Sequence, residues 1–135
     1  MGNAPMTANL TWNDALQFSG SVGSQTAILD GDGKAGLSPV QALALAIAGC
    51  MAMDVVDIVR KGRHPIVGLD VKFTGDRAET PPRRFTRVQL HFIVRGAVPA
   101  DAITRAIGLS REKYCSVSNS LRSDIALETS FEVVP

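Results

Sequence analysis

The sequence predicts an α+β fold with the element order β-β-β-α-β-β-α-α-β. Several short segments alternate apolar and polar residues with the period of two that is typical of strands with one buried face. One long, almost wholly apolar segment, residues 39–61, lies among them between helix start and stop signals. The strands come in consecutive runs, which favours antiparallel neighbours with the helices gathered on one face of the sheet.

Three strands are expected at the start of the chain. Residues 8–12 and 16–18 alternate apolar and polar side chains, and residues 26–29 form a third apolar run. The Asp-Gly-Asp-Gly-Lys segment at 30–34 resembles the start of a calcium loop, but the twelfth position is Gln41 where such loops need a glutamate. A turn built from residues that tolerate positive φ is therefore predicted here.

The central helix is expected to run from Pro39 to about Lys61. Ser38 can cap its free N–H groups, Pro39 suits the first helical position, and Gly62 is a stop signal. The first half of this helix is apolar nearly all round, so it needs cover from a sheet on one side and from a second subunit on the other.

The rest of the chain predicts a hairpin, a second helix and a last strand. The second helix is expected to start at a cap formed by Asp101 and to break at Cys115, and residues 125–133 alternate as a final strand. The expected buried faces of the hairpin strands are Val67, Leu69, Val71 and Phe73, then Val88, Leu90, Phe92 and Val94.

The composition limits the classes of partner. A length of 135 residues predicts one domain, 1–135, and 14 basic against 13 acidic residues without a basic stripe argues against nucleic acid. The apolar stretch at 42–53 ends at Asp54 and is too short to cross a bilayer, so no membrane partner is expected. The first residues do not read as a secretory signal, and we expect a cytoplasmic protein.

The two cysteines lie in contrasting contexts. Cys50 is in the middle of the apolar helix, where a small structural core residue is the simple interpretation. Gly49 beside it costs about 1 kcal/mol relative to alanine, which usually signals close approach of a backbone or a substrate. Cys115 follows Arg111 by one helical turn and precedes the possible caps Ser116 and Ser118, features that favour a reactive thiolate.

Three segments together resemble the OsmC/Ohr family, most nearly its YhfA-like branch. They are SPVQALALAIAGCMAMDVVDIVR at 38–60, RAETPPRRFTR at 77–87 and REKYCSVSNSL at 111–121. The resemblance implies antiparallel sheets wrapped around long central helices in an intertwined homodimer. It also implies reduction of a small organic hydroperoxide, with Cys50 as the peroxidatic thiol and Cys115 as the resolving thiol.

By the same resemblance a dithiol reductant, in this family often lipoyl-linked, restores the pair, and no metal or organic cofactor is required. Neither His64, in a loop, nor His91, on the less apolar side of its strand, is expected to bind a metal.

The sequence departs from the family at two charged positions. No arginine precedes Arg60, and the position of the family's helix-start glutamate is Val40, with Gln41 beside it. A buried thiol without a nearby cation stays largely protonated at neutral pH. The candidates for a replacement cation are Lys34, Arg111 and Arg122.

This departure leaves three hypotheses open. The first is a thiol-dependent peroxidase that uses Cys50 and Cys115. The second is a non-catalytic dimer that binds a small apolar ligand or senses oxidation. The third is a structural interaction protein in which the cysteines have no chemical role.

Overall fold

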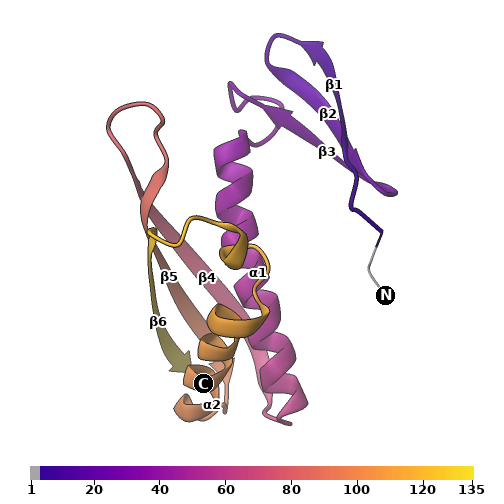
Figure 1. Cartoon of the computed structure of the whole chain (residues 1–135). Helices are drawn as coiled ribbons and strands as arrows, with labels where there is room; N and C mark the ends of the chain where they lie inside the picture. The colour runs from indigo at the N-terminus through magenta and orange to yellow at the C-terminus, as the bar shows by residue number, and fades with distance from the viewer. Residues whose placement is uncertain (1–3) are drawn as a thin grey trace. The chain divides into compact units, whose positions relative to one another are not determined.

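The computed structural model describes residues 4–135 of the chain and has the predicted order of elements (Figure 1). The chain divides into two compact units, one ending at Leu43 and the other covering Ala44–Pro135. The prediction that they act as one domain stays a prediction. The elements are β1 (Asn9–Asp14), β2 (Gln17–Val22), β3 (Gln25–Asp30), α1 (Pro39–Lys61), β4 (Ile66–Arg77), β5 (Phe85–Gly96), α2 (Ala100–Leu109), a π-helical turn (Ser110–Tyr114), a 3₁₀ turn (Ser118–Ser120) and β6 (Ala126–Val134).

The first unit contains a three-stranded antiparallel meander, β1-β2-β3. Asp30, at the end of β3, is buried and its carboxylate accepts the backbone N–H groups of Ala35, Asp32 and Lys34. These hydrogen bonds, with that of Ala35 the strongest influence, lower the pKa of Asp30. Residues 30–34 thus form a turn closed by a carboxylate, with Gly33 at a φ of +69°.

The second unit contains a mixed sheet of order β4-β5-β6. β4 and β5 form the predicted antiparallel hairpin, but β6 lies parallel to β5, with Phe92 opposite Phe131. The expectation of antiparallel neighbours throughout was wrong at this pair. The chain crosses over through α2 between β5 and β6, and such a crossover returns the second strand in the same direction as the first.

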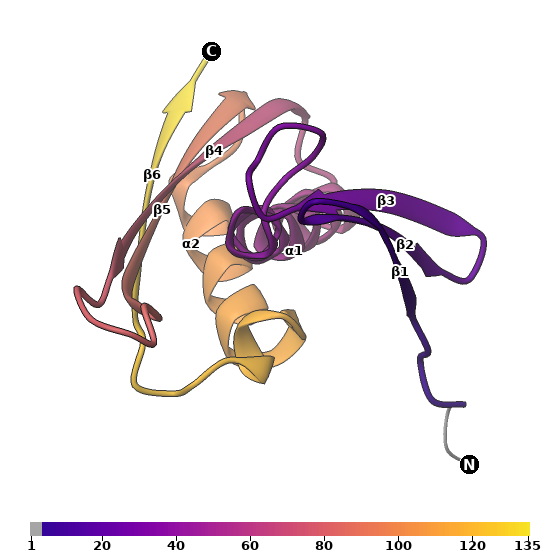
Figure 2. The same cartoon turned by 90° about the horizontal axis from the view of Figure 1, so that it is seen from above.

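The core of the second unit lies between this sheet and the two helices, which lie on one of its faces (Figure 2). The predicted inward residues of β5 are all buried. On β4, Val67 is 77% exposed, against the prediction, because a register shift between Ile66 and Gly68 interrupts the alternation. The buried side chains are Val88, Leu90, Phe92 and Val94 on β5, Ile47, Met51, Val55 and Val59 on α1, and Ile103, Ala106 and Ile107 on α2.

Both ends of α1 follow the sequence signals. The Ser38 side chain accepts the backbone N–H of Gln41, and the Gln41 side chain accepts the backbone N–H of Ser38, which is a reciprocal capping box. By length and composition alone α1 is apolar enough to cross a membrane. Its buried stripe, with one residue per turn packed in the core, is that of a core helix.

The predicted cap of α2 was wrong. Pro99 occupies the cap position and makes no side-chain cap bond, whereas Asp101 lies within the first turn. A carboxylate there still stabilises the helix through the helix dipole.

Candidate redox site

Cys50 lies in the middle of α1, one residue before the buried Met51. The buried stripe of the helix faces the core, and Cys50 is at its border, where its side chain is half-buried. A Cβ atom built on Gly49 would meet no other atom of residues 4–135 within 4 Å. The glycine next to Cys50 is therefore not explained by packing within the described chain.

Cys115 is positioned by an irregular turn. After Leu109 the helix widens to the π-helical turn of residues 110–114, and the N–H of Cys115 donates to the carbonyl of Ser110 at 2.7 Å. The side-chain amide of Asn119 donates to the carbonyls of Cys115 and Arg111 at 2.8 and 3.2 Å. These bonds hold Cys115 fully buried with its sulfur turned inward.

The fold brings the two predicted cysteines together. The Sγ atoms of Cys50 and Cys115 and a carboxylate oxygen of Asp54 all lie within 4.8 Å of one another, and both thiols are free. Sixty-four residues of sequence separate the cysteines, so this proximity is a property of the fold. A disulfide between them requires the two sulfurs to approach to about 2.05 Å.

The surroundings of Cys115 keep its thiol protonated. Burial raises the pKa of Cys115, and the neighbouring Cys50 sulfur raises it further, while hydrogen bonds from Ser118 oppose the shift. One of these is a bond from the Ser118 backbone N–H to Cys115 Sγ at 3.3 Å. A thiol with a raised pKa beside a second sulfur is suited to react after that sulfur has been oxidised.

Sequence reasoning missed two polar members of this cluster, Asp54 and Ser110. Asp54 lies four residues after Cys50, on the same helix face, and the hydroxyl of the buried Ser110 donates to its Oδ2 at 2.7 Å. The spacing of four between Cys50 and Asp54 was a usable signal. The role of Ser110 depends on the packing of the π-helical turn against α1, which no local pattern reveals.

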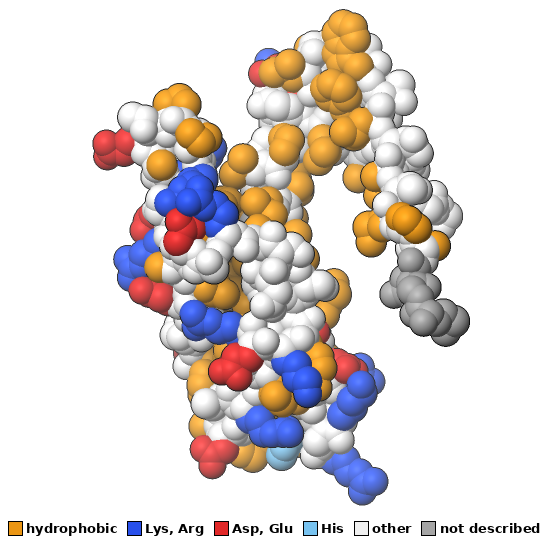
Figure 3. Space-filling view, viewed as in Figure 1, with side chains coloured by type: hydrophobic (Ala, Val, Ile, Leu, Met, Phe, Trp, Pro, Cys, Tyr) orange, Lys and Arg blue, Asp and Glu red, His pale blue; other side chains and the backbone are white. Residues whose placement is uncertain are grey.

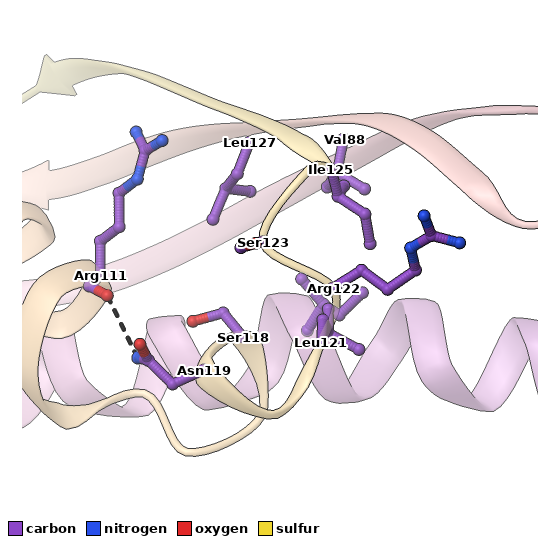
Figure 4. A pocket seen from close by; sticks show the side chains of 10 residues that line it. Val88, Arg111, Ser118, Asn119, Leu121, Arg122, Ser123, Ile125 and Leu127 are labelled. Atoms are coloured by element: carbon purple, nitrogen blue, oxygen red, sulfur yellow. Dashed lines mark hydrogen bonds between the residues drawn. The ribbon is translucent and has the colours of Figure 1, made fainter.

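A small pocket of ≈ 170 Å³ borders this cluster (Figure 4). Ile47, one turn before Cys50, and Ser118, whose N–H bonds the Cys115 sulfur, both line it. Leu121, Ile125 and Leu127 supply apolar walls, and the side chains of Arg111 and Arg122 lie at opposite ends (Figure 4). The pocket thus combines apolar walls with the polar side chains of Ser118, Asn119 and Ser123, and it has an arginine at each end.

The three candidate cations are placed differently. Lys34 belongs to the turn of the first unit. The Arg122 guanidinium is bound in bidentate fashion by Asp124, whereas Arg111 has no ion pair among residues 4–135. Within those residues no lysine or arginine is hydrogen-bonded to either sulfur.

The histidines lie away from the thiols. Both ring nitrogens of His91 contact β6, Nδ1 at 2.7 Å from Ser130 Oγ and Nε2 at 3.0 Å from Glu132. The His91 ring therefore belongs to the surface of the β5-β6 sheet, and the cysteine cluster contains no histidine among the described residues.

Comparison with known proteins identifies the family of this chain. Residues 31–130 match the family described as OsmC-like protein. This chain belongs to the OsmC-like family. It is 42% identical to protein YhfA of Escherichia coli strain K12 over 132 residues, which are 96% of this chain and 98% of that protein.

Solved structures share the fold. A hypothetical protein from Aquifex aeolicus VF5 superposes with a TM-score of 0.90 at 25% identity, covering 98% of both chains. An organic hydroperoxide resistance protein OsmC from Legionella pneumophila superposes with a TM-score of 0.72 at 16% identity, covering 98% of this chain and 100% of that one. The OsmC-like fold that the sequence predicted is confirmed.

Proposed function

We propose that this protein is a thiol-dependent peroxidase that reduces organic hydroperoxides through Cys50 and Cys115. The observation that carries the proposal is that the sulfur atoms of the two free cysteines lie within 4.8 Å of each other. The family supports it, since a structural relative with the same fold is named as an organic hydroperoxide resistance protein and a predicted redox protein.

The proposed reaction has three steps. The half-buried Cys50 thiolate attacks the O–O bond of the hydroperoxide and takes up the terminal oxygen, and with one proton the alcohol leaves. The Cys115 thiol condenses with the resulting sulfenic acid, so that a disulfide forms and water leaves. A dithiol then reduces the disulfide by two successive exchange steps and becomes a disulfide itself.

The pocket supports an organic substrate. Its apolar walls can hold the hydrocarbon part of an alkyl hydroperoxide, which hydrogen peroxide lacks. Arg111, which has no ion pair among residues 4–135, can stabilise negative charge that develops on the leaving oxygen. We therefore expect cumene and t-butyl hydroperoxide to react faster than hydrogen peroxide.

Steady-state kinetics test this function. The reduced protein is supplied with cumene hydroperoxide, t-butyl hydroperoxide or hydrogen peroxide, with dihydrolipoamide as the reductant, and the consumption of peroxide is followed. We expect turnover that is fastest for the organic substrates. The Cys50→Ser protein controls for contaminating peroxidases. Equal turnover by that variant, or no turnover of any peroxide by the natural protein, would refute the proposal.

One observation favours a second function, a non-catalytic member that binds an apolar ligand or senses oxidation. No lysine or arginine among residues 4–135 is hydrogen-bonded to either sulfur, and the charged group that lies within 4.8 Å of them is the Asp54 carboxylate. Alkylation of Cys50 at a series of pH values separates the two functions. A midpoint near or above the ordinary thiol value of about 8.5 favours the non-catalytic function, and a midpoint well below it favours the peroxidase.

We also propose a homodimer, supported by the outer face of α1. Leu45, Gly49 and Met53 are spaced by four residues and so share one face, on which Leu45 is 63% and Met53 73% exposed. A glycine between two large apolar residues lets another helix approach closely. Hydrophobic side chains also gather over the β1-β2-β3 meander (Figure 3), where Leu10 and Trp12 are exposed.

Substitution of Gly49 by leucine tests the dimer. The position has no neighbour within 4 Å among the described residues, so the single chain tolerates leucine and gains helix propensity, while a close helix partner would clash. Gly108→Leu in α2 is the matched control, because Gly108 is equally free of neighbours. Light scattering should find a dimer for the natural protein and the control, and a monomer for Gly49→Leu. A monomeric natural protein would contradict the proposal.

We place the protein in the cytoplasm, with a lipoyl-linked dithiol as its reductant. A reducing compartment supplies the dithiol that the proposed cycle needs to restore the two thiols. The relative rates of reduction by dihydrolipoamide, thioredoxin and glutathione identify the class of reductant. Faster reduction by glutathione would contradict the proposal.

A further inference from the structure

The carboxylate of Asp54 has no role in the peroxidase chemistry. Its oxygen lies within 4.8 Å of the Sγ atoms of both Cys50 and Cys115. The side chain is nevertheless held in place by Ser110. A carboxylate fixed between two thiols requires a separate explanation.

The three side chains have the chemistry of a ligand set for a soft divalent cation. Two cysteine sulfurs and one carboxylate oxygen are typical donors to zinc, and three protein ligands leave a fourth position open. Cys50 and Asp54 are one helical turn apart on α1, so the helix presents two donors on one face, and the turn after α2 brings the third.

A second layer of hydrogen bonds orients these donors. The Ser110 hydroxyl donates a hydrogen bond to Oδ2 of Asp54 at 2.7 Å, and Oδ1 accepts no hydrogen bond from residues 4–135. The Ser118 backbone N–H donates to the Cys115 sulfur at 3.3 Å. Such partners fix the direction of a ligand's lone pairs and are a regular part of metal sites. Ser110 is itself fully buried, so its hydroxyl is held rigidly.

The geometry and the charge both fit a bound cation. Tetrahedral zinc, with Zn–S bonds of about 2.3 Å and Zn–O bonds of about 2.0 Å, sets S···S at about 3.8 Å and S···O at about 3.5 Å. The present separations, within 4.8 Å, reach these values by small side-chain rotations. Two thiolates and one carboxylate carry three negative charges, and no lysine or arginine among residues 4–135 is bonded to them.

We propose that Cys50, Cys115 and Asp54 of the reduced protein bind a zinc-class divalent cation. The sequence did not predict this site, because the three donors meet only in the folded chain. A cleft of ≈ 590 Å³ lined by Asp54, Leu109 and Tyr114 gives the carboxylate side of the cluster access to solvent.

Metal binding and the proposed peroxidase chemistry exclude each other, and this consequence rests on the proposed function. The thiolates react once the cation has dissociated from them, and they then donate two electrons to the hydroperoxide. With two protons they yield a disulfide, an alcohol and water, and the disulfide sulfurs no longer bind the cation. Bound zinc therefore slows turnover, and one cation is released per disulfide formed.

Cobalt titration of the reduced, untagged protein tests the site. We expect one Co²⁺ per chain, with the intense near-ultraviolet absorption of thiolate-to-cobalt charge transfer, and displacement by Zn²⁺. Asp54→Asn should weaken Co²⁺ binding at least about tenfold. Asp57→Asn is the matched control, because Asp57 lies on the same helix, is paired with Lys61 and is not a member of the three-donor cluster. It should bind as the natural protein does.

X-ray absorption of the zinc-loaded natural protein is a second measurement that depends on no variant. We expect two sulfur and at least one oxygen ligand. Absence of the cobalt band, unchanged binding by Asp54→Asn, or a zinc shell without two sulfurs would overturn the site. None of these results bears on peroxidase turnover, which is measured in the presence of a chelator.

Discussion

The two cysteines differ most in the backbone that carries them. Cys50 lies on a regular helix, half-buried, and no backbone N–H of residues 4–135 donates to its sulfur. Cys115 lies in an irregular turn, fully buried, with its sulfur bonded by a backbone N–H and its pKa raised mainly by burial. The more accessible thiol is the one suited to meet a peroxide, and the enclosed one is suited to react only with its neighbour.

Replacing each cysteine by serine in turn should distinguish the two roles, and it should change peroxide turnover more than any other substitution proposed here. Cys50→Ser removes the attacking atom, so turnover of cumene hydroperoxide should fall at least about 1000-fold. Cys115→Ser leaves the first step intact, so Cys50 should consume one equivalent of peroxide and stop as a sulfenic acid. Stopped-flow consumption of peroxide and dimedone trapping with mass spectrometry measure the two outcomes. Equal loss of the first turnover in both variants would contradict the assignment of roles.

Alkylation rates should differ between the two thiols in the reduced natural protein. Because the thiolate is the reactive form, a raised pKa keeps Cys115 protonated and unreactive at neutral pH, and its labelling should rise only as pH passes above the ordinary thiol value of about 8.5. Peptide mapping after brief exposure to iodoacetamide gives both rates at each pH. Equally fast labelling of Cys115 and Cys50 at pH 7 would contradict the expected difference in reactivity between the two thiols.

The two pocket arginines should have the smallest effects, and unequal ones. Arg122 is already neutralised by Asp124, whereas Arg111 has no carboxylate partner in the described part of the chain. An exposed charge contributes about 0.2–1 kcal/mol, so Arg111→Gln should lower the rate of hydroperoxide attack by at most about fivefold. Arg122→Gln is the matched comparison and should change it less. Single-turnover kinetics measure both rates. A larger loss of rate in Arg122→Gln than in Arg111→Gln would show that Arg122 is the cation that assists the attack.

Local signals in the sequence were enough for most of the fold. Capping at Ser38, the stop at Gly62 and the alternation along β5 predicted the elements correctly, because each depends on residues close in sequence. The parallel pairing of β6 could not be predicted in this way, since strand direction depends on the crossover through α2. Likewise, the exposure of Val67 results from a local register shift that no alternation pattern reveals.

The candidate site was predictable only in part. The resemblance to a known family supplied Cys50 and Cys115, and the fold brings their sulfurs together. Asp54 and Ser110 were missed, because their meeting depends on a π-helical turn that packs its first residue against α1. The turn adds one residue to the helical repeat, and the direction of every side chain after it changes accordingly.

Disulfide mapping after stoichiometric oxidation tests the central claim most directly. The reduced natural protein is treated with one equivalent of cumene hydroperoxide per chain, alkylated and digested without reductant. We predict a peptide pair linked through Cys50 and Cys115, with loss of both free thiols and formation of one equivalent of cumyl alcohol. Recovery of both cysteines in alkylated form after consumption of the peroxide would contradict the redox role of this pair.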